Sequence, residues 1–211
     1  MKSDGKCNYC NGTFSGSAMS KHLQSCPERK KKIGQDKGNG KVYLIKASCK
    51  PFWVYFEADS SSTLKDIDSF LRDLWLECCG HMSGFKILTD FYSSHPEEDD
   101  KSMNIRLDKA LSVGLKFIHE YDFGTTTTLL LTVVSERNGK AGRINAIARN
   151  NLPDFKCKCG KQPKEVCSQC VFEIGEEAVL CSHCAKKHEC GEDMMLPFVN
   201  SPRTGMCGYT G

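Results

Sequence analysis

The cysteines constrain this chain more than any other feature of its sequence. Fourteen of them occur among 211 residues: three lie in the first 26 residues, eight in the last 55, and only Cys49, Cys78 and Cys79 between. The opening segment, MKSDGKCNYC, has no apolar stretch of the kind that directs secretion. Disulfide frameworks are typical of small secreted folds, whereas a reducing compartment keeps cysteines as thiols. We therefore expect a cytoplasmic protein whose terminal cysteines bind metal.

The segment 1–28 has the spacing of a four-ligand zinc site. Two residues separate Cys7 from Cys10, eleven separate Cys10 from His22, and three separate His22 from Cys26. Ligands at i and i+4 share one helix face, so the four side chains can converge around one ion. The pattern resembles the classical zinc finger with its last histidine replaced by Cys26. That resemblance implies a role in reading DNA, although one finger addresses only about three base pairs.

The segment 29–40, RKKKIGQDKGNG, is basic and lacks apolar periodicity, which predicts a flexible linker. Arg29, Lys30, Lys31 and Lys32 can contact phosphates, so nucleic acid is a candidate partner through the finger and this stretch. The formal net charge of the whole chain is only +3. It becomes slightly negative if the terminal cysteines bind three zinc ions as thiolates. Bulk charge therefore gives no support to nucleic-acid binding, and a protein partner is the other hypothesis.

From Cys157 onward, residues that can bind metal come in couples. Four couples fit two four-coordinate sites, and in a cross-braced arrangement alternate couples share an ion. We expect one site to contain Cys157, Cys159, Cys181 and Cys184, and the other Cys167, Cys170, His188 and Cys190. The segment 157–190 resembles the B-box and related treble-clef modules, except that a single residue separates its first two cysteines.

Several alternatives stay open for this cluster. Cys207 can replace Cys190 in the last site, and His183 can replace a neighbouring ligand. A one-zinc ribbon would reduce the total from three ions to two, with ligands Cys167, Cys170, Cys181 and Cys184. Iron competes with zinc for the four-cysteine site, because thiolates suit both metals. In every scheme protein ligands fill the coordination shell, which is typical of a structural ion rather than a catalytic one.

Residues 41–136 have the pattern of a conventional folded domain. The runs KVYLIKASC, PFWVYFEAD, GFKILTDFY, LKFIHEYDFG and TTTTLLLTVVSE predict strands, and TLKDIDSFLRDLWLEC has helical spacing. We expect an α+β fold with a central mixed or antiparallel sheet, flanked by two small zinc modules. Residues 137–155 are expected to be a connector with a short helix, and 156–211 a cysteine-rich module with a docking tail. No apolar run is long enough to span a membrane.

The central region also carries a set of residues found together in a known family. The set comprises Pro51, Phe52, Trp53, Thr63, Leu64, His81, Met82, Phe85, Tyr121, Asp122, Phe123 and Gly124. With the closing segment NSPRTGMCGYTG, it resembles the plasmid pRi "ORF three"-like family, which includes proteins encoded beside transposable elements and zinc-bearing archaeal members. The resemblance implies strands around a helical pair but little about activity. Many relatives continue the YDFG motif with acidic, tryptophan and histidine residues, where this chain has threonines and Leu129.

The leading functional hypothesis is a non-catalytic zinc protein that contacts another macromolecule. The first alternative is a nucleic-acid-binding accessory protein linked to mobile elements. The second is an enzyme with a site near Asp122 and His81, which requires both side chains to converge; His119 and Glu57 are the other central acid–base candidates. The adjacent cysteines 78 and 79 are expected to be small buried residues at a helix end.

Exhaustive chelation is expected to unfold both terminal segments, because such short segments cannot assemble an adequate apolar core without metal. Circular dichroism and amide hydrogen exchange before and after chelation measure the effect. Terminal segments that keep their structure without metal would contradict the interpretation.

Overall fold

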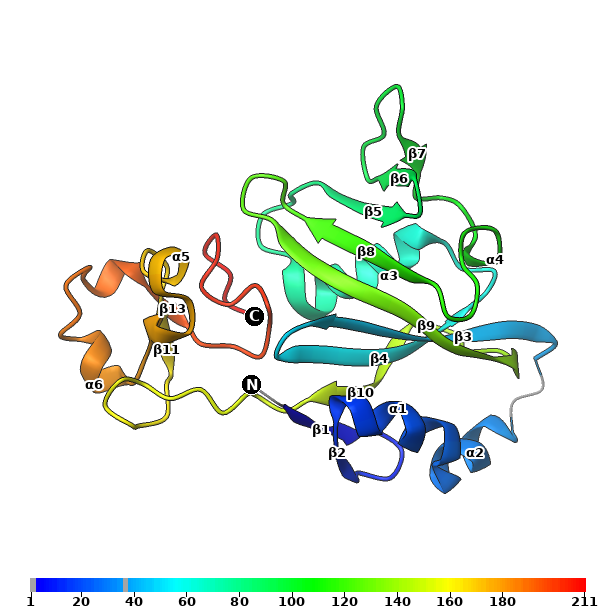
Figure 1. The fold of residues 1–211 in the computed structure, drawn as a ribbon, viewed down its shortest axis with the longest axis horizontal. Coiled ribbons are helices and arrows are strands. Elements are labelled where there is room, and N and C mark those ends of the chain that lie inside the picture. Colours follow the sequence, from blue (N-terminus) through cyan, green and yellow to red (C-terminus); the bar gives the residue numbers. More distant parts are fainter. Residues whose placement is uncertain (1–2, 36–37) are drawn as a thin grey trace.

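The computed structural model describes residues 3–35 and 38–211 (Figure 1). Ten strands form one sheet: β1 (Asp4–Cys7), β2 (Thr13–Ser15), β3 (Gly40–Cys49), β4 (Phe52–Asp59), β5 (Ser83–Ile87), β6 (Asp90–Ser93), β7 (Lys101–Ser102), β8 (Lys116–Tyr121), β9 (Thr127–Gly139) and β10 (Asn145–Asn150). Three short strands form a second sheet: β11 (Glu165–Cys167), β12 (Val179–Leu180) and β13 (Met195–Pro197). The helices are α1 (Gly16–Ser25), α2 (Pro27–Ile33), α3 (Leu64–Leu71), the π-helix η1 (Arg72–Leu76), α4 (Leu107–Ala110), α5 (Val171–Ile174), the 3₁₀ helices η2 (Gly175–Ala178) and η3 (Glu192–Met194), and α6 (Ser182–Ala185).

The large sheet has the order β2-β1-β10-β4-β3-β9-β8-β5-β6-β7. Its neighbouring strands run antiparallel except β6 and β7, which are parallel. The expected α+β class with a mixed sheet is confirmed. Among the described residues, no helix combines the length and apolar character that crossing a membrane requires.

Strand β4 is buried on both faces of the sheet, which explains its nearly continuous apolar sequence. Alternate side chains of a strand point to opposite faces. Val54 and Phe56 join the core formed with α3 and η1, whereas Trp53 and Tyr55 join a second cluster with the N-terminal module. The N-terminal module, residues 4–26, thus shares its core with the sheet. Figure 1 shows this module along one edge of the sheet, beside β10.

Helix α3 begins where the sequence predicts. The Thr63 hydroxyl accepts a hydrogen bond from the Asp66 amide at 3.2 Å, and the Asp66 carboxylate accepts one from the Thr63 amide at 2.7 Å. This reciprocal arrangement is a capping box, which satisfies amides that the first helical turn leaves without partners. The buried face of α3 presents Leu64, Ile67 and Leu71 to the sheet.

Two connecting segments differ from the sequence prediction. The short helix expected within 137–155 is absent from the described structure there; Asn145–Asn150 instead forms β10, which lies between β1 and β4. Of the expected flexible linker, residues 29–33 belong to α2, and residues 36–37 lie outside the described residues. Tertiary contacts determine the structure of both segments, because β10 pairs with β1 and β4 and a buried ion pair holds α2.

That ion pair places Arg29 in the interior instead of on a phosphate-binding surface. The Arg29 guanidinium donates to the Glu57 carboxylate, which also accepts from Arg137 at 2.8 Å. Burial alone would raise the pKa of Glu57, but the hydrogen bond from Arg137 and the charge of Arg29 hold this pKa below its usual range. The three side chains connect α2, β4 and β9.

Glu57→Gln is expected to lower the free energy of unfolding by about 3 kcal/mol at pH 7, because it leaves two arginines without a buried counter-charge. The folded-state pKa of Glu57 is depressed, so this contribution is complete above its unfolded pKa and is lost as pH falls through the folded value. The difference between wild type and variant therefore shrinks below about pH 4. Urea unfolding at several pH values measures it.

The matched control is Glu136→Gln, which removes an exposed ion pair with Lys41. That change should cost less than about 1 kcal/mol. Equal effects of the two substitutions would show that the buried ion pairs do not hold α2 to the sheet.

Candidate metal centres

The described residues contain four groups of cysteine and histidine side chains that can each hold a metal ion. In every group the four ligand atoms lie within 4.8 Å of one another. All fourteen cysteines are free thiols. The groups are Cys7, Cys10, His22 and Cys26; Cys78, Cys79, His81 and Cys207; Cys157, Cys159, Cys181 and Cys184; and Cys167, Cys170, His188 and Cys190. The sequence predicts three ions, one fewer than the number of groups.

The N-terminal group is built from β1, the turn after it, and α1. Cys7 ends β1, His22 lies on α1, and Cys26 follows the last helical residue. The Cys10 Sγ lies 3.3 Å from the His22 Nε2. The Phe14 ring stacks on the imidazole of His22 with 3.9 Å between ring centroids. The finger-like spacing therefore brings its four side chains together.

Two pKa shifts in this group favour the forms that bind metal. The backbone amide of Gly12 donates to the Cys10 sulfur at 3.4 Å and lowers the pKa of that thiol. Burial lowers the pKa of His22. A thiolate and a neutral imidazole are the states that ligate zinc, so both shifts reduce the cost of losing a proton.

The C-terminal module, residues 157–197, holds two groups whose members alternate along the chain. In the first, the Cys159 Sγ lies 3.6 Å from the sulfurs of Cys157 and Cys181. In the second, the Cys170 Sγ lies 3.3 Å from the His188 Nε2 and 3.6 Å from the Cys190 Sγ. This is the pairing that a cross-brace requires, and the role of these residues as ligands stays a prediction.

The structure separates the alternatives that the spacing leaves open. The cysteine couples 167/170 and 181/184 fall in different groups, so the four side chains that the one-ion ribbon requires do not converge. Cys190, and not Cys207, completes the last group. His183 is exposed and outside the four groups.

The four-cysteine group of the C-terminal module contains a thiol whose pKa is lowered, Cys157. Burial would raise the pKa of Cys157, but backbone hydrogen bonds at Cys159 and Cys181 and the neighbouring thiols lower it to about 6. A thiolate at neutral pH is ready to bind a soft or borderline cation.

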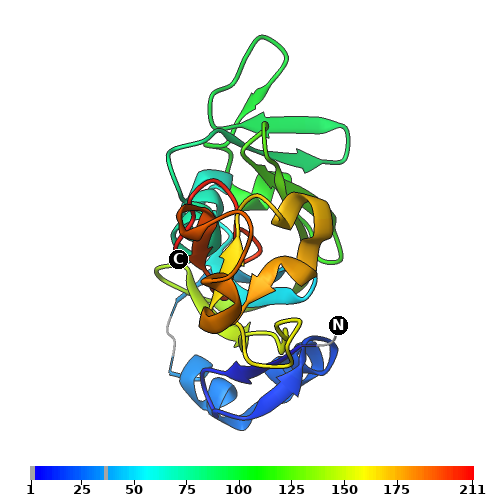
Figure 2. The same ribbon diagram turned by 90° about the vertical axis from the view of Figure 1, so that its left-hand side faces the viewer.

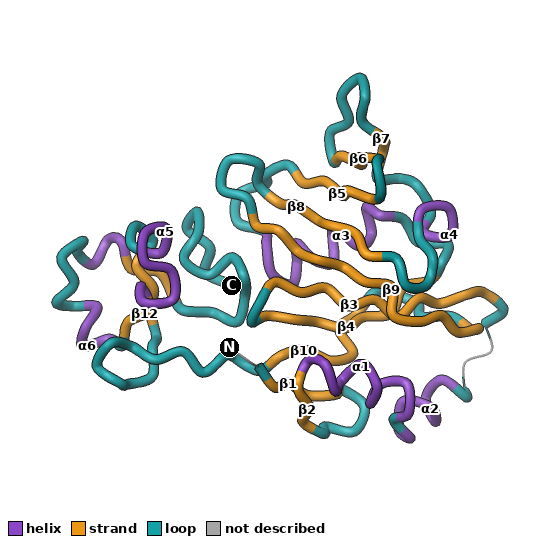
Figure 3. Tube along the Cα trace, in the orientation of Figure 1, coloured by secondary structure: helices purple, strands orange, loops and turns teal. Residues whose placement is uncertain are grey.

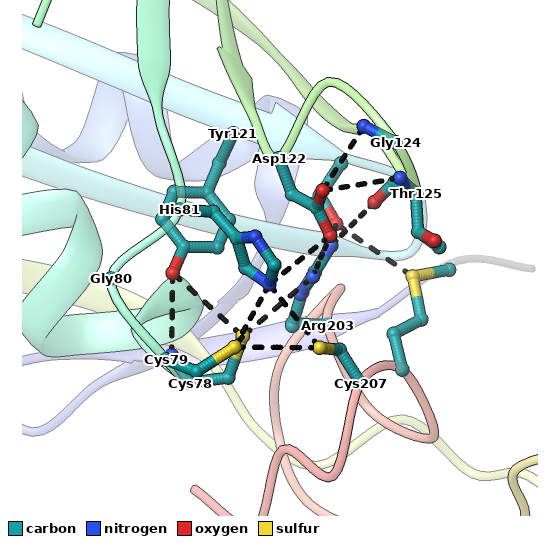
Figure 4. Close-up of polar contacts among 12 residues, drawn as sticks. Cys78, Cys79, Gly80, His81, Tyr121, Asp122, Gly124, Thr125, Arg203 and Cys207 are labelled. Carbon is teal, nitrogen blue, oxygen red and sulfur yellow. Dashed lines mark hydrogen bonds and ion pairs between the residues drawn. The ribbon is translucent and has the colours of Figure 1, made fainter.

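The fourth group was not predicted, and it joins segments that are distant in sequence (Figure 4). Cys78, Cys79 and His81 lie in the loop after η1, and Cys207 belongs to the C-terminal tail, residues 198–211. Cys79 is exposed, which corrects the expectation that both adjacent cysteines are small buried residues. The closely spaced Cys-Cys-x-His was the only local signal, because Cys207 lies 128 residues beyond Cys79.

Arg203 fixes the tail beside this group. Its guanidinium is fully buried, forms an ion pair with Asp122 and donates to the Thr127 hydroxyl at 3.2 Å. The Asp122 carboxylate also accepts from the amides of Gly124 and Thr125 at 3.1 and 3.2 Å. Burial would raise the pKa of Asp122, but the bond from Arg203 and these amides lower it. The carboxylate is thus held ionised as an anchor.

Asp122 and His81 do converge, as the enzyme hypothesis requires. The His81 Nε2 lies 3.5 Å from an Asp122 oxygen, but the same nitrogen is only 3.0 Å from the Cys79 sulfur. His119 is buried against Asp68 at 2.7 Å, and Glu57 is held by its two arginines. The central acid–base candidates therefore all have structural partners.

Comparison with known proteins gives little further information. No family model matches the chain, and no curated protein matches it. One solved structure of related shape is the crystal structure of MM3350, a protein of unknown function from Methanosarcina mazei Go1. It is 16% identical, the alignment covers 52% of this chain and 67% of that one, and the TM-score is 0.45.

Proposed function

We propose that this chain is a zinc protein whose terminal ions are structural and whose terminal modules contact another macromolecule. The observation that carries the proposal is the convergence of four protein ligand atoms in each terminal group. Mixed sulfur and imidazole ligands suit zinc, and four protein ligands leave no open position for water or substrate. A closed shell of this kind supports folding instead of hydrolysis. Fourteen free thiols also fit a reducing compartment such as the cytoplasm.

A protein partner is supported by the surface of the C-terminal module. Phe172, Ile174 and Met194 are exposed large apolar residues there, and the exposed fraction of Phe172 is 61%. Apolar side chains that remain in water on a small module are typical of an interaction surface. Figure 2 shows this module in front of the sheet and above the N-terminal module.

The resemblance to the plasmid pRi "ORF three"-like family stays part of the proposal. Its support is that two motifs behind the resemblance touch: Asp122 of the YDFG motif pairs with Arg203 of the closing segment. Sequence features 81 residues apart thus belong to one structural unit.

Each of the three terminal groups is expected to bind one zinc ion independently of the others. Cys10→Ser, Cys159→Ser and His188→Ala should each lower the zinc content by one ion per chain, because each removes one of four ligands. Native mass spectrometry with elemental analysis measures the content. Iron in place of zinc would contradict the assignment of the metal.

Two variants outside the groups serve as matched controls. Cys49→Ser and His183→Ala remove a cysteine and a histidine that belong to none of the four groups, so the zinc content should not change. An unchanged metal count in all five variants would exclude the terminal groups as zinc sites.

Nucleic acid is the second candidate partner, and one observation favours it. Lys30, Lys31 and Lys32 are all exposed on α2, while the neighbouring Arg29 is buried. Consecutive exposed cations next to a zinc-finger-like module can neutralise phosphates.

Reversal of these three lysines to glutamate should weaken binding to short duplex and single-stranded probes by more than about tenfold. The slope of log K against log salt should also become shallower by roughly 0.9 for each phosphate that the variant no longer neutralises. Fluorescence anisotropy measures both. The control reverses Lys65, Lys109 and Lys116, which are exposed elsewhere. Equal reductions of affinity in the two triple variants, or no wild-type binding at low salt, would rule out this surface.

A further inference from the structure

We propose that Cys78, Cys79, His81 and Cys207 form a fourth zinc site, and that its ion fastens the C-terminal tail to the central domain. This site lies outside the terminal modules on which the proposed function rests. Three of its ligands come from the loop between η1 and β5, and the fourth comes from the tail. Figure 4 shows the four side chains directed toward one another.

The distances between the ligand atoms fit one tetrahedral ion. Two thiolates at about 2.3 Å from such an ion lie about 3.8 Å apart. The Cys79 Sγ lies 3.8 Å from the Cys78 Sγ and 3.6 Å from the Cys207 Sγ. The His81 Nε2 lies 3.0 Å from the Cys79 Sγ and 3.2 Å from the Cys207 Sγ, close to the 3.3 Å between nitrogen and sulfur in two of the other groups. Sulfur separations of 3.6 Å also occur in both C-terminal groups, so the fourth group has the dimensions of the others.

The distribution of cysteines argues against a chance cluster. Thirteen of the fourteen cysteines lie in the four groups, and only Cys49, on β3, does not. The fourth group combines three cysteines with one histidine, which is the composition of two of the other groups. Cys79 and Cys207 are exposed and add nothing to an apolar core, whereas with Cys78 and His81 they form a complete ligand set.

Polar side chains beside the group hold one of its sulfurs in place. Three thiolates, a neutral imidazole and Zn²⁺ carry a net charge of about −1. Arg203 directs its Nη2 to the Cys78 sulfur at 3.7 Å, and the Tyr121 hydroxyl lies 3.7 Å from the same sulfur. Arg203 is shared between this sulfur and Asp122, whose carboxylate lies 3.5 Å from the His81 Nε2. Arg203 and Tyr121 thus orient the Cys78 ligand, as outer partners of metal ligands do. The tail thus supplies both a ligand, Cys207, and the buried cation beside it.

The ion adds a further attachment to a tail in which Arg203 and Tyr209 are already buried. The Ser201 hydroxyl donates to the Trp75 carbonyl at 2.7 Å, and Asn200 donates to the Asn150 carbonyl at 2.8 Å. These bonds hold the start of the tail, which consists of loop throughout (Figure 3). Cys207 is the ligand beyond Arg203, so the ion holds the end of the tail over the YDFG turn.

The exposure of its ligands makes this ion the easiest to remove. Each terminal group contains at least one buried cysteine, whereas the fourth has none, and Cys79 and Cys207 are both exposed. A chelator can therefore reach the fourth ion without opening a module core. Mild chelation should free the tail while the terminal modules keep their ions.

The test compares the full wild-type chain with Cys207→Ser and with the control Cys49→Ser. Native mass spectrometry should find four zinc ions in wild type and the control but three in Cys207→Ser. With a chromogenic zinc chelator, one ion per chain should leave in a first phase that Cys207→Ser lacks. Trypsin cleavage after Arg203, which requires release of the tail, should be at least roughly tenfold faster in Cys207→Ser.

His81→Gln is a second variant that alters the site from the central domain, with His95→Gln as its control. His81→Gln should reproduce the loss of one ion and the faster cleavage, and His95→Gln should show neither. Three ions in wild type and an unchanged count in Cys207→Ser would overturn the fourth site and leave the proposed function intact. Absence of zinc from every group would overturn both. Loss of one ion with unchanged cleavage would overturn the fastening of the tail.

Discussion

The burial of β4 on both faces is the constraint on which the arrangement of the molecule depends. Val54 and Phe56 serve the core with α3, while Trp53 and Tyr55 need cover on the opposite face. The N-terminal module provides that cover through Met19 and Leu23 of α1. A unit of fewer than thirty residues gains an apolar core that it could not assemble alone. The finger-like segment is therefore part of the sheet domain and not a separate domain on a linker.

The C-terminal module and the tail are joined to the same domain by two different kinds of contact. Val166 and Val179 of the cysteine-rich module belong to the main apolar core. The tail is held by polar contacts, of which the buried pair between Arg203 and Asp122 is the most enclosed. A buried charge is tolerated only where it is paired, so this contact determines the position of the tail with little freedom. The fourth cysteine and histidine group lies directly beside it.

Local sequence patterns were sufficient to predict much of the fold and the candidate ligands of three of the four groups. The helical spacing of 63–78 and the alternating strands of the central region depend on neighbours in the sequence, as do Cys-x-x-Cys couples and the i, i+4 pair His22 and Cys26. The connecting segments were harder. Nothing in RINAIARNN indicates that a sheet needs a strand there, and a run of basic residues does not reveal that Arg29 meets Glu57.

The sequence by itself determined the α+β class and indicated twelve candidate ligands, because hydrophobic periodicity and short ligand spacings are local properties. Only the tertiary structure decided that Cys207 meets Cys79 and not Cys170. It also decided that the N-terminal module shares a second apolar cluster with β4 and that the C-terminal module contributes to the main core. Both outcomes depend on contacts between residues far apart in the chain, and spacing along the chain carries no information about which distant surfaces pack together.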